Sequence, residues 1–116
     1  MSPRLIDHFQ NPRNVGDLSA PALVAEASNP VCGDILRLSA RIVDGRIAEV
    51  RYKVRGCAAS IAAGSALTEL MEGRDAAALG KLTREDVDNA VGGLSNESKH
   101  AATLCIEGVR TLLRQF

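Results

Sequence analysis

The chain has 116 residues, of which 46% are hydrophobic, and its 14 basic side chains balance 14 acidic ones. This length and composition predict one folded domain over residues 1–116 and exclude a chain that is disordered throughout. Zero net charge, with one tyrosine, two phenylalanines and no tryptophan, argues against a nucleic-acid partner, which would need a basic surface or stacking rings. No apolar run approaches the ~20 residues that span a membrane, so we expect no membrane partner either.

Three cysteines occur in a chain whose first residues lack the pattern of a secretory signal. We therefore expect a cytoplasmic protein, because thiols stay reduced there and disulfide frameworks are rare. An odd number of cysteines in that setting favours metal or sulfur chemistry.

In chain order, the first predicted element is a short helix over residues 3–10, with Ser2 as its N-cap. A short strand is predicted over residues 23–27. Between residues 35 and 55, apolar and polar residues alternate on both sides of Asp44-Gly45, which predicts an antiparallel hairpin with one buried face.

Helical spacing takes over after the hairpin and predicts a helix over residues 58–72. A capping box of Thr83 and Asp86 predicts a second helix that runs through Val91. A last helix is predicted from about Ser98 to the C-terminus. Strands early and helices late indicate an α+β fold, a small antiparallel β-sheet of about three strands with helices packed on one face.

The hairpin pattern also predicts its register, because both apolar sets must face the same side and a one-residue slip would bury Arg and Glu. Extending this ladder places Asp34 opposite Gly56 and Gly33 opposite Cys57. Opposed residues have Cβ atoms ~5 Å apart and diagonal ones ~7 to 8 Å, so Cys32, Asp34 and Cys57 are expected to meet at the open end of the hairpin. The predicted pairs are Leu36–Val54, Leu38–Tyr52, Ala40–Val50 and Ile42–Ala48.

Each of these three residues has a local setting that suits metal binding. Cys32 precedes Gly33, which lets an ion approach the backbone closely. Cys57 leads into a helix, whose N-terminal end favours the thiolate that binds metal or attacks sulfur. Asp34 adds a hard oxygen beside soft sulfur, which suits an exchangeable ion. The alternative interpretation is that both cysteines are small hydrophobic residues at the sheet rim and that Asp34 only starts a strand.

Four segments occur in an order that is typical of one known family. They are DHFQNPRNVG at residues 7–16, NPVCGD at 29–34, GCAAS at 56–60 and TEL at 68–70. With these segments the chain resembles the IscU/NifU N-terminal family of iron–sulfur cluster assembly scaffolds. The resemblance implies a non-catalytic protein that receives sulfur from a cysteine desulfurase, builds a [2Fe–2S] cluster and passes it to apo iron–sulfur proteins. It also implies that Cys32, Asp34 and Cys57 bind the cluster, iron or zinc, and that the aspartate makes the cluster labile.

The sequence departs from the family pattern at the start of the last helix. His100 stands where the family has the residue before its third cysteine, and Ala101 stands in place of that cysteine. Alanine can neither bind a cluster nor accept sulfur. His100 is therefore a candidate fourth ligand, since neutral imidazole binds iron and zinc, and the neighbouring Glu97 could orient its ring. The alternative is a solvated residue at a helix start.

Cys105 is a possible additional thiol, four residues after Ala101. On a helix this separation is ~6 Å along the axis and ~40° around it, which favours a rescue of the missing ligand. Against it, Cys105 belongs to an apolar stripe typical of core packing, and His100 would lie ~140° away around the helix. The stripe consists of Ala102, Cys105, Val109, Leu112 and Phe116.

Three functions follow from these residues. The leading hypothesis is an iron–sulfur scaffold or carrier, with Cys32, Asp34, Cys57 and His100 as ligands. The alternatives are a zinc-binding regulatory module that docks a desulfurase, and a persulfide carrier that uses Cys57. A homo-oligomer is left open. For His8, in the first helix, we expect a surface or packing role.

Overall fold

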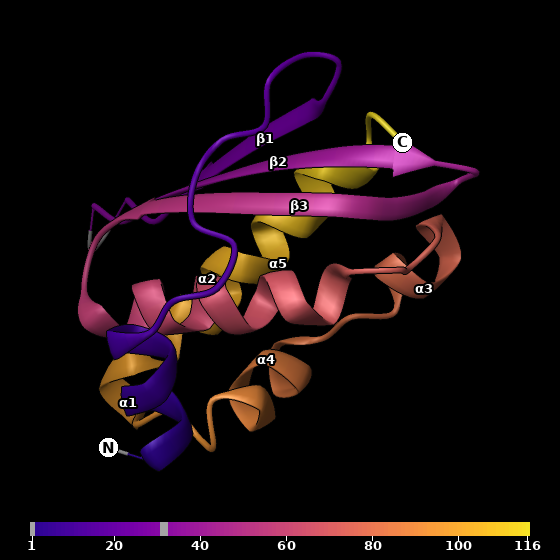
Figure 1. Cartoon of the computed structure of the whole chain (residues 1–116). Coiled ribbons are helices and arrows are strands. Elements are labelled where there is room, and N and C mark those ends of the chain that lie inside the picture. The colour runs from indigo at the N-terminus through magenta and orange to yellow at the C-terminus, as the bar shows by residue number, and fades with distance from the viewer. Residues whose placement is uncertain (1, 31–32) are drawn as a thin grey trace.

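The computed structural model describes residues 2–30 and 33–116. Over these residues a three-stranded antiparallel sheet, in the order β1-β2-β3, lies on a layer of helices (Figure 1). The predicted α+β class and the packing of helices on one face of the sheet are confirmed. The elements are α1 (Pro3–Gln10), β1 (Leu23–Ser28), β2 (Ile35–Val43), β3 (Arg46–Arg55), α2 (Ala58–Met71), α3 (Ala76–Gly80), α4 (Arg84–Ala90), the 3-10 turn η1 (Asn96–Ser98) and α5 (His100–Leu113).

The β2–β3 hairpin confirms three of the four predicted pairs and corrects the fourth. Ile42 pairs with Ile47 rather than with Ala48, because a β-bulge interrupts the ladder after Arg41. The two-residue turn at Asp44 and Gly45, both with positive φ, pairs the residues on either side of it. The bulge then absorbs Ala48 as the extra residue, so Ile47 is buried and Ala48 is exposed.

Helices α2 and α5 cover one face of the sheet and form the core with it (Figure 1). Close packing depends on a glycine at one crossing point. A Cβ atom on Gly64 of α2 would lie 2.6 Å from the ring of Tyr52 on β3. Tyr52 is 1% exposed, and its hydroxyl donates to the carbonyl of Ile61. This contact fixes α2, and therefore the residues at its N-terminal end, against β3.

The opposite face of the sheet is partly covered by the segment between α1 and β1 (Figure 1). Asp17 in this segment forms ion pairs with Arg37 on β2 and with Lys53 on β3. The N–H of Leu18 donates to the hydroxyl of Ser39, which is buried although the alternation placed it on the solvent face. The hairpin therefore buries a residue of its second face as well as the one face that the alternation predicted.

Two predicted helix starts are confirmed by their caps. Ser2 caps α1, and the capping box of Thr83 and Asp86 opens α4, which ends one residue before Val91. The short helix α3 was not predicted, and the last helix begins at His100 because a 3-10 turn precedes it. No helix of residues 2–30 and 33–116 is long and apolar enough to cross a membrane.

Candidate metal centre

Asp34 lies at the end of the sheet where β2 begins, and its side chain is buried. Two backbone hydrogen bonds lie beside it, from Gly33 N–H to the Asn29 carbonyl and from Asn29 N–H to the Asp34 carbonyl. The Asp34 carboxylate packs on the backbone of Gly56, where an added Cβ would lie 2.6 Å from the carboxyl carbon. The predicted placement of Asp34 against Gly56 is therefore confirmed. The absence of a side chain on Gly56 makes room for the carboxylate.

Cys57 is the N-cap residue of α2 and is exposed. Its Sγ atom lies 3.5 Å from Oδ2 of Asp34 and 3.6 Å from Nε2 of His100. A groove of about 640 Å³ runs past Cys57 between the start of α1 and the Gly92–Gly93 turn. The thiol is therefore accessible to a partner molecule.

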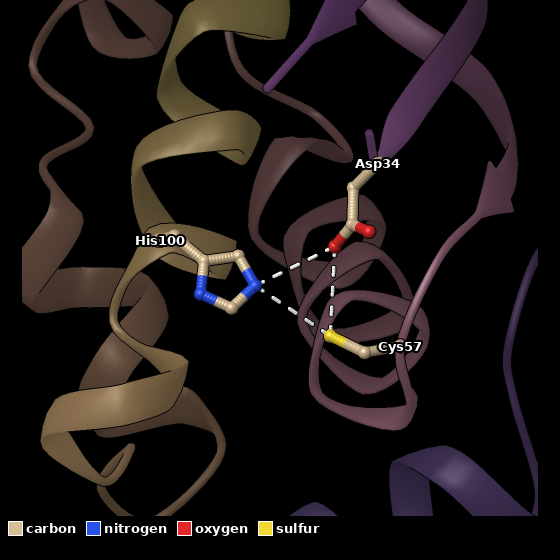
Figure 2. A group of neighbouring side chains, drawn as sticks. All are labelled: Asp34, Cys57 and His100. Carbon is tan, nitrogen blue, oxygen red and sulfur yellow. Dashed lines mark hydrogen bonds and ion pairs between the residues drawn. The ribbon is translucent and has the colours of Figure 1, made fainter. Parts of the chain in front are cut away.

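His100 is the first residue of α5 and completes the cluster (Figure 2). Its Nε2 lies 3.5 Å from Oδ2 of Asp34. Its Nδ1 lies 3.0 Å from the backbone carbonyl of Glu97. A carbonyl only accepts hydrogen bonds, so Nδ1 carries the proton and the lone pair of Nε2 points into the space between Cys57 and Asp34, where a cation would bind. Glu97 was expected to orient the ring as an acidic neighbour, but the contact with the ring comes from its backbone carbonyl.

The separations within this cluster fit one metal ion. Around a tetrahedral ion with bonds of roughly 2.0 to 2.3 Å, ligand atoms lie roughly 3.3 to 3.8 Å apart. The three observed separations are 3.5, 3.5 and 3.6 Å. Figure 2 shows Asp34, Cys57 and His100, which lie at the starts of β2, α2 and α5, pointing toward one common point. One thiol, one imidazole and one carboxylate are donors that iron and zinc both accept.

The electrostatics of the cluster keep Asp34 ionised. Burial on its own would raise the pKa of Asp34, but hydrogen bonds from Ser60 and Cys57 and the nearby His100 outweigh it and lower the pKa below its ordinary value of 3.8. An ionised carboxylate is the form that binds a cation.

The remaining candidates lie apart from this cluster or outside the described residues. Cys32 is one of the residues that the structure does not describe, so its meeting with Asp34 and Cys57 stays a prediction. Cys105 packs in the core, and complete burial raises the pKa of its thiol to about 12. Of the two alternatives for Cys105, its position in the structure agrees with core packing. Ala101 is fully buried. Phe116, at the end of the proposed stripe, is 37% exposed and lies beyond α5, so it does not continue the buried face.

Sequence reasoning included Ser60 in the GCAAS segment but gave it no role. Its hydroxyl donates to Oδ2 of Asp34 over 2.6 Å, and both side chains are buried. The signal that could have found it is its position three residues after Cys57, because residues in the first turn of a helix lie beside the N-cap residue.

The fold and this cluster define a class: a small α+β domain with sulfur, nitrogen and oxygen donors that could hold one metal ion at one end of its sheet. Residues 1–116 match the model of the NifU-like N-terminal domain. The chain belongs to this family, which confirms the resemblance drawn from its sequence segments.

Curated relatives extend over nearly the whole chain. A bifunctional protein NifU/MnmA of Rubrobacter xylanophilus is 44% identical, over 98% of this chain and 24% of its own length. The iron-sulfur cluster assembly scaffold protein IscU 1 of Archaeoglobus fulgidus is 38% identical, over 99% of this chain and 75% of its own. The nitrogen fixation protein NifU of Cereibacter sphaeroides is 46% identical, over 97% of this chain and 46% of its own. The chain thus spans from a quarter to three quarters of the length of these relatives.

Solved structures share the fold. The N-terminal part of a NifU-like protein from Brucella abortus has a TM-score of 0.63 at 22% identity and covers 94% of this chain and 76% of its own. A protein assigned to iron-sulfur cluster assembly for the SUF system in Fervidobacterium islandicum has a TM-score of 0.69 at 18% identity and covers 97% and 93%. At such identities the likeness concerns the fold alone.

Proposed function

We propose that this domain is an iron–sulfur cluster assembly scaffold or carrier, which holds iron or a [2Fe–2S] cluster as cargo and passes it to apo-proteins. The observation that carries the proposal is the convergence of Asp34 Oδ2, Cys57 Sγ and His100 Nε2 within 4.8 Å of one another. Cys32 is proposed as the second thiol ligand. The similarity to relatives such as the iron-sulfur cluster assembly scaffold protein IscU 1 supports this function.

The chemistry of the donors suits a cargo that must leave again. Iron–sulfur clusters are held by thiolates, and imidazole replaces thiolate on one iron of Rieske centres. A carboxylate is a hard ligand that soft, sulfur-bound iron holds less firmly than it holds thiolate. Cys57 is exposed and His100 half-buried, so an acceptor protein can reach the cargo. In this proposal the sulfur comes from a cysteine desulfurase, and the domain itself performs no catalysis.

Anaerobic reconstitution with iron and sulfide tests the proposal. The parent protein should develop the visible charge-transfer bands of a [2Fe–2S] cluster, and Cys57→Ala should abolish them. Cys105→Ala is the matched control: it also removes one thiol, but a thiol buried in the core, and should leave the bands in place. A parent that stays colourless, or a loss of colour in the control that equals the loss in Cys57→Ala, would contradict the proposal.

A zinc-binding module is the second candidate, favoured by one observation. The ligand separations of 3.5 to 3.6 Å already match a single tetrahedral ion. Elemental analysis of the purified protein distinguishes the two functions. One tightly held zinc per chain and no cluster uptake would support a regulatory module that docks a desulfurase without receiving sulfur.

The third function left open by the sequence is that of a persulfide carrier, favoured by the exposed thiol of Cys57 beside a groove. Incubation with a cysteine desulfurase and cysteine, followed by mass spectrometry of the intact chain and its peptides, tests it. Added sulfur on Cys57 in the absence of iron would favour this role. An unchanged mass at every cysteine would exclude it.

A further inference from the structure

The carboxylate of Asp34 accepts a short hydrogen bond from a buried hydroxyl, that of Ser60. Ser60 is 2% exposed and Asp34 4% exposed, and the Ser60 hydroxyl lies 2.6 Å from Oδ2. An ionised carboxylate only accepts hydrogen bonds, so the hydroxyl is the donor. A hydrogen bond to a charged acceptor is stronger than one between neutral groups.

The oxygen that receives this hydrogen bond is the same one that faces the metal position. Oδ2 of Asp34 lies 3.5 Å from Cys57 Sγ and 3.5 Å from His100 Nε2. The Ser60 hydroxyl lies 3.5 Å from Cys57 Sγ. It therefore borders the cluster but is not one of the three candidate metal ligands. A carboxylate oxygen has two lone pairs, so one can accept from Ser60 while the other binds an ion.

Free rotation of the carboxylate is blocked on another side by the backbone of Gly56. Because a Cβ there would lie 2.6 to 2.9 Å from the carboxyl atoms, the carboxylate already fills this space. Ser60 from α2 and Gly56 from the end of β3 thus enclose the Asp34 side chain. Neither residue needs an ion to be present for this arrangement.

We propose that Ser60 is a positioning residue: its hydroxyl fixes Oδ2 of Asp34 toward Cys57 and His100, and so sets how firmly the site retains a metal. This inference rests on the proposed function for the identity of the cargo. It needs only a metal ion for its test. Hydrogen-bond partners behind a metal ligand change metal affinity by about 10-fold to 100-fold when they are removed.

A double-mutant cycle with zinc tests whether Ser60 acts through Asp34. Zinc affinity is measured by competition with a chromophoric chelator for the parent, Ser60→Ala, Asp34→Ala and the double variant. Ser60→Ala should lower the affinity about 10-fold or more in the parent, and by less than about threefold once Asp34 is absent, since no carboxylate is left to position. Equal losses in both backgrounds, or no loss in the parent, would overturn the proposal.

Two further variants separate positioning from a general loss of packing. Ser60→Thr keeps the hydroxyl and should restore zinc affinity relative to Ser60→Ala. Ser65→Ala removes another buried hydroxyl of α2, one that contacts His8 rather than Asp34. It should lower the thermal stability of the apo-protein without changing zinc affinity. The same affinity loss in Ser65→Ala as in Ser60→Ala would show that packing, not positioning, is measured.

Cobalt(II) gives a spectroscopic signature that a purely structural role would not move. The visible ligand-field bands of the cobalt-loaded protein should shift in Ser60→Ala and stay in place in Ser65→Ala. Bands that do not respond to Ser60→Ala would count against the proposal. If iron–sulfur reconstitution fails while zinc affinity follows the cycle, the scaffold function fails and the role of Ser60 stands. If the cluster forms but Ser60→Ala leaves zinc affinity unchanged, the scaffold function stands and the role of Ser60 fails.

Discussion

His8 on α1 and His100 on α5 each place Nε2 3.5 Å from a carboxylate oxygen, that of Glu69 and that of Asp34 respectively. The two sites differ in what contacts the other ring nitrogen. Nδ1 of His8 lies 2.8 Å from the hydroxyl of Ser65 and 3.4 Å from the guanidinium of Arg13. A guanidinium only donates, so Nδ1 of His8 accepts and its proton lies on Nε2, toward Glu69.

His100 has the opposite arrangement, because its Nδ1 faces the carbonyl of Glu97. Its proton lies on Nδ1, and the lone pair of Nε2 points into the space between Cys57 and Asp34, where a cation would bind. A histidine ligand is commonly fixed in this way by an acceptor behind it. The contact of Nδ1 with a backbone carbonyl thus distinguishes His100, a candidate metal ligand, from His8, which packs in the fold.

The site around His8 joins the N-terminal helix to α2. Ser65 on α2 contacts His8, and it also accepts a hydrogen bond from the backbone N–H of Arg13. His8 and Ser65 are both buried. Of the expected surface or packing role of His8, the structure agrees with packing. The difference between the two histidines can be tested by removing each in turn.

His100→Ala should produce the largest effect. Loss of a direct ligand should lower zinc affinity on the order of 100-fold or more, at or beyond the upper end of what outer hydrogen-bond partners contribute. The free energy of unfolding of the apo-protein should change by less than about 0.5 kcal/mol, because the side chain is partly exposed. Chelator competition and urea unfolding measure the two quantities, and an unchanged zinc affinity would remove His100 from the site.

His8→Ala should show the reverse pattern. It removes a buried ring and leaves the Ser65 hydroxyl without its side-chain partner, so the free energy of unfolding should fall by about 2 kcal/mol. Zinc affinity should stay within about twofold of the parent, since the two sites share no contact and distant effects are independent. A large loss of zinc affinity in this variant would show that α1 supports the metal centre.

The features of the fold that the sequence predicted are those that depend on residues close together in the chain. The alternation around Asp44-Gly45 predicted three strand pairs, and Ser2 and Thr83 predicted two helix starts, because such signals depend on neighbours a few residues away. The bulge at Ala48 depends on reconciling a two-residue turn with the register of the whole hairpin. Alternation alone does not contain that constraint.

The candidate site also has one part that the sequence could predict and one part that it could not. The meeting of Asp34 and Cys57 follows from the hairpin register, which the sequence pattern fixes. The placement of His100 at the same point depends on how α5 crosses the sheet, and came from the family resemblance rather than from spacing. The direction of its lone pair depends on the carbonyl of Glu97, and every residue has a carbonyl, so no side-chain pattern could have indicated it.

The difference in burial between the histidines predicts a pH effect that depends on His8. Burial lowers the pKa of His8 below its ordinary value of 6.5, and the charge of Arg13 lowers it further, while Glu69 and Asp7 oppose this. Near and below pH 6.5 the unfolded chain therefore binds more protons than the folded one. The free energy of unfolding decreases as the pH is lowered from 6.5, and it levels off below the pKa that His8 has in the folded state. Urea unfolding between pH 7.5 and 5 should show the decline (roughly the range in which histidine titrates).

His8→Gln serves as the comparison for this decline, since glutamine does not titrate. The slope between pH 6.5 and 5 should be smaller in His8→Gln than in the parent. Carboxylates with a lowered pKa, such as Asp7 and Asp17, lose their contribution nearer their ordinary value of 3.8 and do not mask the effect. Identical slopes would mean that His8 is not the group that titrates.

Glu69→Gln should have the smallest effect and shows how differently the two carboxylates act. Glu69 has a side chain that is 52% exposed, against 6% for Asp34, and a partly solvated pair contributes little. At pH 7.5 His8 is neutral, so the free energy of unfolding should change by less than about 0.5 kcal/mol. At pH 5 the free energy of unfolding of the variant should lie further below that of the parent. Glu69 raises the pKa of His8, so its loss makes protonation of His8 in the folded state less favourable. A deficit equal at both pH values would mean that Glu69 stabilises the fold by a contact other than its charge on His8.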